Sequence, residues 1–234
     1  MTLPVAILAG GMATRLRPLT EKIPKALVEV AHRPFLEWQL KCLAGQGVRE
    51  VVVCVGYLGK DIVEVVGDGR QFGLSVNYSF DGDILIGTAG ALRKALPLLG
   101  GSFFVMYGDS YLSADFSKVE QEYSRAAKRG LMTVLRNGDR WDKSNVEFKA
   151  GCLVGYNKAS PSPAMQFIDY GLSVLSAGAI IEHVRTVPAD LADVFQTMSE
   201  RGELAGLEVD ERFYEIGSFA GLKETEAYLT GLNK

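Results

Sequence analysis

The chain has 234 residues, of which 47% are hydrophobic and 23% are charged. This length and composition are sufficient for one large α/β domain with a full hydrophobic core. The net charge of −3 argues against a broad positive surface, so we expect neither nucleic acid nor a membrane surface as a partner.

The cysteine pattern bears on the compartment. Cys42, Cys54 and Cys152 are odd in number and widely spaced, and only two histidines accompany them. This pattern argues against a disulfide framework or a zinc site and favours the reducing cytoplasm. No apolar run reaches membrane-spanning length, and no basic region precedes a long apolar segment. We therefore expect a cytoplasmic protein without a leader or an anchor.

The first element predicted is a buried strand over residues 5–8, which ends at Gly10 and Gly11. Glycines let the backbone turn sharply and bring its N–H groups close to an anion. Guanidinium and ammonium groups suit a polyphosphate, and three follow: Arg15, Arg17 and Lys25. The segment lacks the P-loop and the dinucleotide fingerprint. It is therefore either a phosphate-handling loop of another kind or an ordinary turn with solvated charges.

Strands and helices alternate in the next part of the chain. Helical spacing of apolar residues predicts helices over 35–43, 60–66 and 88–96, whereas apolar runs predict strands over 51–55 and 74–78. At the start of the third helix, Gly87 and Thr88 by themselves indicate an ordinary helix start, with Thr88 as a cap and small residues for close packing.

The strongest buried strand is expected over 103–107, and Gly108 and Asp109 follow it directly. Ligands of open α/β sheets bind outside the carboxyl ends of the strands, so Asp109 is expected to point into a functional crevice. The alternative is a carboxylate that merely caps a helix.

A helix over 115–129 and a strand over 131–135 continue the alternation. This order predicts an α/β fold with a doubly wound, mostly parallel, Rossmann-like sheet and helices on both faces. Strands over 145–148 and 152–156, joined by a turn at 149–151, indicate a small β insertion.

The C-terminal part is expected to form helices over 190–202 and 219–232, with short strands over 204–209 and 212–216 between them. We interpret residues 1–234 as one domain that carries the insertion at about 137–175.

The segment from Leu8 to Thr20, with Pro24 and Lys25 after it, resembles the signature of the sugar-1-phosphate nucleotidylyltransferases, Gly-Gly-x-Gly-Thr-Arg-Leu-x-Pro-Leu-Thr followed by Pro-Lys. Ala13 replaces the third loop glycine, which would cost on the order of 1 kcal/mol if the position needs positive φ. Further similarities extend in family order to Glu226. The chain most resembles the short bacterial guanylyltransferases that act on mannose 1-phosphate or manno-heptose 1-phosphate.

The resemblance implies a nucleotide site after the first strand, at the third helix and after the strand over 103–107. Its residues would be Leu8, Ala9, Gly10, Gly11, Thr14, Arg15, Gly87, Thr88 and Gly108. It also implies a sugar-phosphate site formed by Lys25, Lys158, Asn145, Asp169 and Gly171. Asp169 stands where the family has asparagine, and Asn157 where it has glutamate. A carboxylate only accepts hydrogen bonds, whereas an amide both accepts and donates, so these changes would alter which sugar hydroxyls the site binds. The alternative is that both residues are polar surface residues without a role in binding.

The resemblance further implies that Asp109 and Glu215 hold Mg²⁺, with Mn²⁺ able to substitute. Glu215 stands where the family has aspartate; a rim salt bridge is the alternative. Arg15, Lys25 and Asp109 are the expected catalytic residues. The implied reaction transfers a nucleotide, with GTP favoured, to a hexose or heptose 1-phosphate and releases pyrophosphate.

Three alternatives stay open: a uridylyl- or cytidylyltransferase of the same fold, an inactive nucleotide-sugar-binding regulatory module, and a dinucleotide-dependent oxidoreductase, whose fingerprint the sequence lacks. The expected partners are the nucleoside triphosphate and the sugar 1-phosphate, and the expected state is a monomer or homodimer.

Overall fold

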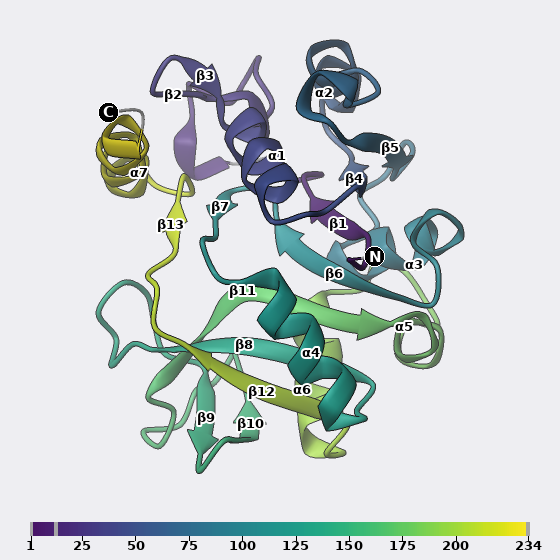
Figure 1. Ribbon diagram of the computed structural model, residues 1–234, viewed down its shortest axis with the longest axis vertical. Coiled ribbons are helices and arrows are strands. Elements are labelled where there is room, and N and C mark those ends of the chain that lie inside the picture. The colour runs from purple at the N-terminus through teal and green to yellow at the C-terminus, as the bar shows by residue number, and fades with distance from the viewer. Residues whose placement is uncertain (1, 12–13, 233–234) are drawn as a thin grey trace.

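The computed structural model describes residues 2–11 and 14–232, so the question about Ala13 lies outside the described residues. A single mixed sheet runs through the molecule (Figure 1). Its main strands, in spatial order, are β5 (Ser75–Phe80), β4 (Glu50–Val55), β1 (Val5–Leu8), β6 (Ser102–Tyr107), β11 (Phe167–Ser176), β8 (Gly130–Arg136) and β12 (Leu204–Val209).

Helices cover both faces of this sheet. One core contains side chains of α1 (Phe35–Gly45), α2 (Gly59–Val66) and α4 (Phe116–Ala126), and the other contains side chains of α3 (Thr88–Leu99), α5 (Ala177–His183) and α6 (Leu191–Glu200). Within β4, Val51 and Val53 belong to the first core, whereas Val52 and Cys54 belong to the second. Because both faces are buried, the strand reads as a continuous apolar run. The predicted α/β, mostly parallel sheet with helices on both faces is confirmed.

β8 does not lie beside β6, as a simple alternation of helices and parallel strands would place it. β8 pairs with β11 and β12, and β11 lies between β8 and β6, antiparallel to both. Sequence reading did not identify residues 167–176 as a strand. Gly171, with φ +94°, and a register shift between Asp169 and Ser173 interrupt the pairing, which obscures the periodicity of the segment.

The predicted small hairpin is confirmed. β9 (Val146–Lys149) and β10 (Cys152–Tyr156) pair antiparallel, and Ala150 and Gly151 turn the chain with positive φ. Val146 pairs with Phe167, so the hairpin is attached to the end of β11.

The predicted strand over 212–216 is shorter and lies away from the main sheet. β13 (Tyr214–Glu215) pairs with β7 (Ser110–Tyr111), which directly follows β6. Nearby, α7 (Phe219–Leu232) packs beside β2 (Glu29–Val30) in a third, smaller core, and β2 pairs with β3 (Arg33–Pro34) (Figure 1). The C-terminal segment that contains β13 and α7 therefore lies near the carboxyl end of β6.

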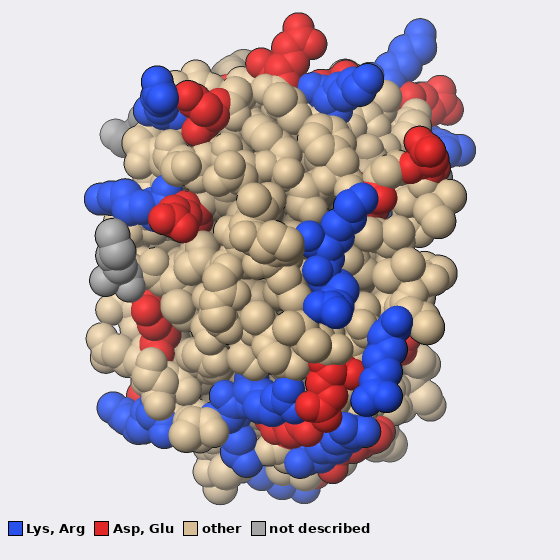
Figure 2. Space-filling view, turned by 90° about the vertical axis from the view of Figure 1, so that its right-hand side faces the viewer, with Lys and Arg blue, Asp and Glu red and all other residues tan. Residues whose placement is uncertain are grey.

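Short 3-10 helices also occur in the described part of the chain, at η1 (Thr14–Leu16), η2 (Lys25–Leu27) and η3 (Arg70–Phe72). Among residues 2–11 and 14–232, no helix combines the length and the apolar character that are needed to cross a bilayer. Figure 2 shows one face of the molecule, on which Lys and Arg lie beside Asp and Glu at the upper and lower ends and along the edges, while much of the centre is uncharged.

Candidate active site

A cavity of about 390 Å³ opens at the carboxyl ends of β1, β4 and β6. The chain continues from β1 to β4 and β5 on one side, and β6 lies on the other side of β1. This is a topological switch point, where open α/β sheets bind ligands. All nine residues predicted for the nucleotide line this cavity: Leu8, Ala9, Gly10, Gly11, Thr14, Arg15, Gly87, Thr88 and Gly108.

The loop after β1 is held by its neighbours on both sides. The Ala9 N–H donates to the Cys54 carbonyl, and the Gly108 N–H donates to the Leu8 carbonyl, both at 2.9 Å. A Cβ on Gly10 would lie 3.2 Å from the Gly56 nitrogen, so the glycine allows a close backbone approach. Neither Gly10 nor Gly11 has positive φ. The pair therefore does not use the left-handed backbone conformation that glycine permits.

The predicted catalytic cation Lys25 lies beside the predicted catalytic acid. Its Nζ donates to Asp109 Oδ2 at 2.6 Å, and the two side chains are 16% and 33% exposed. Arg15 reaches the same region, because a Cβ on Gly217 would lie 3.2 Å from Lys25 Nζ and 3.4 Å from Arg15 Nη2. The structure thus gathers both cations and the acid at one end of the first cavity.

Asp109 and Glu215 come from opposite halves of the chain and meet through backbone pairing. Glu215 pairs with Ser110 between β13 and β7, and the Ile216 N–H donates to the Asp109 carbonyl at 2.9 Å. The Glu215 carboxylate accepts hydrogen bonds from the Gly217 N–H and, at 2.8 Å, from the Ser218 hydroxyl.

Both carboxylates line a second cavity. Magnesium is usually bound by one or two carboxylates, with water and substrate phosphates as the remaining oxygen ligands. The chemistry of this donor pair fits such an ion, because both members are oxygen anions and face a space that is large enough for phosphate.

The second cavity, of about 510 Å³, adjoins the first, and Arg15, Tyr107 and Asp109 line both. Four of the five residues predicted for the sugar phosphate line it: Asn145, Lys158, Asp169 and Gly171. Lys25 lines the first cavity instead. The insertion and β11 thus form the walls of a second site next to the nucleotide cavity.

Asp169 is fixed at the bulge of β11. Its N–H donates to Asn145 Oδ1, and its Oδ1 accepts from the Gly171 N–H, both at 2.9 Å. Burial raises the pKa of Asp169 to about 6, although the Gly171 N–H and the Lys158 ammonium act in the opposite direction. Asn145 therefore orients the segment with its side-chain oxygen, while Asp169 presents a titratable acid to the cavity.

The start of α3 is built differently from the predicted threonine cap. Gly87 is the N-cap, with φ +79°, and a Cβ there would overlap the Ala189 backbone. Thr88 Oγ1 accepts from the Leu191 N–H at 2.7 Å and donates to Asp190 Oδ1 at 3.2 Å. The Thr88 hydroxyl therefore ties α3 to α6, while the residue still lines the first cavity.

Sequence reading missed several residues that line the cavities. Asp81 follows β5 and lines the first cavity, and the strand-end rule that identified Asp109 would also have found it. In the second cavity the missed residues include Arg140, Trp141 and Arg212. Both guanidinium groups lie over the Trp141 ring, 5.2 and 5.3 Å from its centroid. Arg212 lies 71 residues after Trp141 in the sequence, so only folding brings them together and no local pattern indicates the contact.

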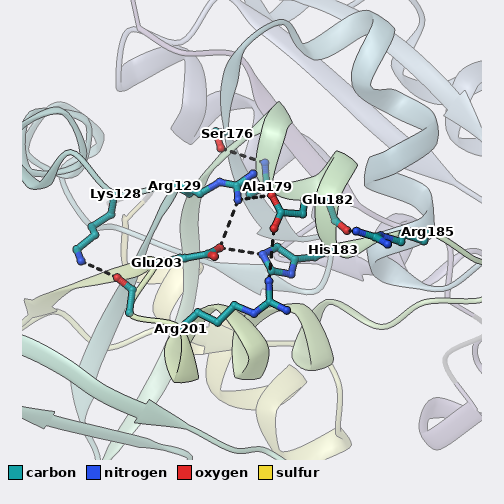
Figure 3. A network of polar contacts seen from close by, with 10 residues as sticks. Lys128, Arg129, Ser176, Ala179, Glu182, His183, Arg185, Arg201 and Glu203 are labelled. Carbon is teal, nitrogen blue, oxygen red and sulfur yellow. Dashed lines mark hydrogen bonds and ion pairs between the residues drawn. The ribbon is translucent and has the colours of Figure 1, made fainter.

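A separate polar network lies at α5 and the start of β12 (Figure 3). Glu182, His183 and Glu203 place one potential metal-ligand atom each within 4.8 Å of one another. Glu182 pairs with Arg129 at 2.6 Å and Arg201 at 3.4 Å, and Glu203 Oε2 accepts from His183 Nε2 at 2.8 Å. Because guanidinium groups already compensate the carboxylates, we interpret the group as a structural charge network.

The chain is similar to several known proteins. An N-acetylmuramate alpha-1-phosphate uridylyltransferase of Neisseria meningitidis is 40% identical over 119 residues, which cover 50% of this chain and 52% of that protein. A mannose-1-phosphate guanylyltransferase catalytic subunit beta of Drosophila pseudoobscura is 28% identical over 97% of this chain and 60% of that protein. The chain thus spans about half to three-fifths of the length of these relatives.

A solved structure, the inositol-1-phosphate CTP transferase from T. maritima, superimposes with a TM-score of 0.81 at 21% identity, covering 98% of this chain and 96% of that one. It shows the fold. The profile of the family described as "Nucleotidyl transferase" matches residues 5–144, which include the loop after β1 and Asp109. The chain therefore belongs to the nucleotidyl transferase family.

Proposed function

We propose that this chain transfers a guanylyl group from GTP to a hexose or heptose 1-phosphate and releases pyrophosphate, making a sugar nucleotide for glycan synthesis. The observation that carries the proposal is the pair of adjoining cavities with Arg15 and Asp109 at their junction. Two anionic substrates bound there would meet beside the cations that line the first cavity.

In this reaction an oxygen of the sugar phosphate attacks the α-phosphorus of the triphosphate. A new P–O bond forms, the bond between the α-phosphorus and the bridging oxygen breaks, and its electron pair leaves with pyrophosphate. No protein nucleophile is needed, because positioning and charge stabilisation dominate such transfers. Arg15 and the N–H groups of the loop after β1 would bind the β- and γ-phosphates, and Lys25 would bind the α-phosphate and the attacking phosphate.

Asp109 and Glu215 would hold Mg²⁺, or Mn²⁺ in its place. When bound, such an ion neutralises phosphate charge and orients the phosphate oxygens. Lys25 would then exchange its present partner, Asp109, for phosphate oxygens. The ion pair keeps both groups in position until the substrates enter.

Lys158 would bind the phosphate of the sugar, and Asp169, held by Gly171, would accept hydrogen bonds from sugar hydroxyls. The donor-only Arg140 and Arg212 line the same cavity. The second cavity would therefore bind an oxygen-rich, anionic ligand. We place the reaction in the cytoplasm, where nucleoside triphosphates are made.

The names of the relatives indicate two possible nucleobases for the substrate of this chain, guanine and uracil. The fly protein is named a guanylyltransferase and the meningococcal protein a uridylyltransferase. Uridylyl transfer to an acidic sugar 1-phosphate such as N-acetylmuramate 1-phosphate is therefore the second candidate. It is favoured by the 40% identity to the meningococcal protein over 119 residues, which are half of this chain.

The test is a pyrophosphate-release assay with four nucleoside triphosphates and a panel of sugar 1-phosphates, including mannose, glucose, a manno-heptose and N-acetylmuramate. Release with GTP and a neutral hexose or heptose phosphate supports the proposal, and release with UTP and N-acetylmuramate 1-phosphate supports the second candidate. Binding of nucleotides without release under any condition would instead indicate a regulatory module.

A further inference from the structure

Gln39 is a polar side chain enclosed by apolar ones. It lies on α1 and is 1% exposed, and its helix neighbours Trp38 and Leu40 belong to two different hydrophobic cores. Its Oε1 atom is buried and has no hydrogen-bond partner among the residues that the structure describes. An unpaired buried acceptor is unfavourable, so the presence of this amide has to be explained by what its nitrogen does.

The side-chain nitrogen of Gln39 bridges both ends of the turn after β6. Nε2 donates to the Tyr107 carbonyl at 2.9 Å and to the Ser110 carbonyl at 2.8 Å. These carbonyls stand directly before and after Gly108 and Asp109. An amide nitrogen has two hydrogens, one for each carbonyl, whereas the reversed amide would set Oε1 against two oxygens. Gln39 therefore attaches the turn that carries Asp109 to α1.

Backbone hydrogen bonds hold the same turn from its sides. The Gly108 N–H donates to the Leu8 carbonyl, and the Asp109 carbonyl accepts from the Ile216 N–H, both at 2.9 Å. These bonds connect the turn to β1 and to the residue after β13. Gln39 supplies the support from α1, and it is not among the residues that line either cavity. Any effect of Gln39 on a ligand must therefore act through the turn.

The same helix also holds the segment that follows Lys25. Trp38 Nε1 donates to the Val30 carbonyl of β2 at 2.8 Å, and Figure 1 shows α1 beside β7 and β3. Adjacent residues of α1 thus fix two segments that are far apart in the sequence. One of them carries Asp109, and the other follows Lys25, whose Nζ donates to Asp109 Oδ2. α1 is therefore a common support for both members of this ion pair.

We propose that Gln39 is a positioning residue, which fixes the turn at Gly108 and Asp109 so that the Asp109 carboxylate reaches a divalent metal ion where the two cavities meet. The net stabilisation from two hydrogen bonds is modest, and the unpaired Oε1 offsets part of it. An apolar side chain of the same length would fill the space equally well. What distinguishes the amide is the placement of the turn, and groups that orient a metal ligand change metal affinity by about 10–100-fold when they are lost.

This inference rests on the proposed role of Asp109 in metal binding, and its test does not depend on turnover. The probe is Mn²⁺ alone, whose dissociation constant from the full chain is measured by electron paramagnetic resonance. Gln39→Met removes the amide and keeps the length of the side chain. Gln46→Met is the matched control, because Gln46 follows the same helix, donates to the Ala114 carbonyl at 3.3 Å and lines neither cavity. Asp109→Asn shows how much of the binding depends on the carboxylate.

We expect Gln39→Met to weaken Mn²⁺ binding about tenfold or more and Gln46→Met to leave it unchanged. In the metal-free protein, Gln39→Met should also speed hydrogen exchange of the Ile216 amide, which donates to the Asp109 carbonyl, about tenfold relative to the amides of β8. A side chain that only fills space would not loosen this turn selectively, because a general loss of stability would affect β8 as well.

Wild-type Mn²⁺ affinity in folded Gln39→Met, together with weaker binding in Asp109→Asn, would overturn the inference and leave the proposed metal site intact. Equal acceleration of exchange at Ile216 and in β8 would also overturn it. Equal Mn²⁺ binding by the wild type and Asp109→Asn would instead remove the metal role of Asp109, and the inference with it, while transfer in the pyrophosphate assay is decided separately.

The wild type alone decides the matter if Gln39→Met does not fold. Its Gln39 side-chain N–H protons, buried and bonded to two carbonyls, should exchange about 10²-fold more slowly than those of Gln46. Equal exchange rates for the two side chains would show that Gln39 does not hold the turn and would overturn the inference.

Discussion

Lys25 Nζ lies 2.6 Å from Asp109 Oδ2, across 84 residues of sequence. Because the ammonium is already paired, its removal leaves a half-buried carboxylate without compensation. We expect Lys25→Ala to lower the free energy of unfolding of the ligand-free protein by about 1 kcal/mol and turnover by about 10²-fold or more. Denaturant unfolding and initial rates measure the two effects. A variant that is as stable and as active as the wild type would contradict both the pair and its role.

Arg15 gives a cleaner test of phosphate binding, because its side chain is exposed and its loss should change stability by less than about 0.5 kcal/mol. Arg15→Ala should still lower turnover by about 10²-fold. Arg17→Ala is the matched control, since Arg17 is also exposed but lines neither cavity. Equal rates in the two variants would mean that general positive charge, and not contact from Arg15, matters.

Lys158→Ala should raise the KM for the sugar phosphate about tenfold or more and leave the KM for the triphosphate within about twofold, because Lys158 lines only the second cavity. Lys149→Ala, on the hairpin that precedes Lys158 and paired with Glu147, should change neither constant. Two-substrate kinetics separate these effects. Equal weakening of both substrates would place Lys158 on the nucleotide.

Glu215→Gln removes one charge from the proposed metal site but keeps an oxygen that can accept from Ser218. We expect at least about tenfold more Mg²⁺ for half-maximal activity, equivalent to about 1.4 kcal/mol, and loss of activity in the wild type with a chelator. Glu211→Gln, at an exposed position four residues earlier, is the control. If Glu215→Gln needs the same Mg²⁺ concentration as the wild type, Glu215 is not a metal ligand and only orders the turn at Gly217 and Ser218.

The pKa of Asp169 gives a pH-dependent component of stability. In the folded protein this pKa is raised from 3.8 to about 6, so between these values the folded state binds more protons than the unfolded state. The contribution of Asp169 to the free energy of unfolding is fully present below about pH 4 and falls as pH rises to about 6. Above that pH it stays constant. The change is at most about 3 kcal/mol.

Asp169→Asn keeps an oxygen for the Gly171 N–H and cannot ionise. We therefore expect the variant to gain stability relative to the wild type as pH rises from 4 to 7, measured by denaturant unfolding at each pH without ligand. A difference between the two proteins that stays constant over this range would show that the acid is not buried in this way.

Local sequence alone determined the elements that bury apolar runs and the loop after β1 that lines the first cavity. The run at 103–107 predicted β6, and the rule that ligands bind at strand ends directed attention to Asp109, which lines both cavities. These predictions succeeded because burial on both faces and glycine chemistry act within a few residues.

Tertiary structure decided the features that depend on distant segments. The sequence does not indicate that β11 separates β6 from β8, because Gly171 and the bulge beside it interrupt the periodicity of that strand. Nor does it indicate that Lys25 pairs with Asp109, or that Thr88 is engaged with Leu191. Pairing partners across many residues are selected by how the sheet and its cores close as a whole, and a local pattern carries no information about that closure.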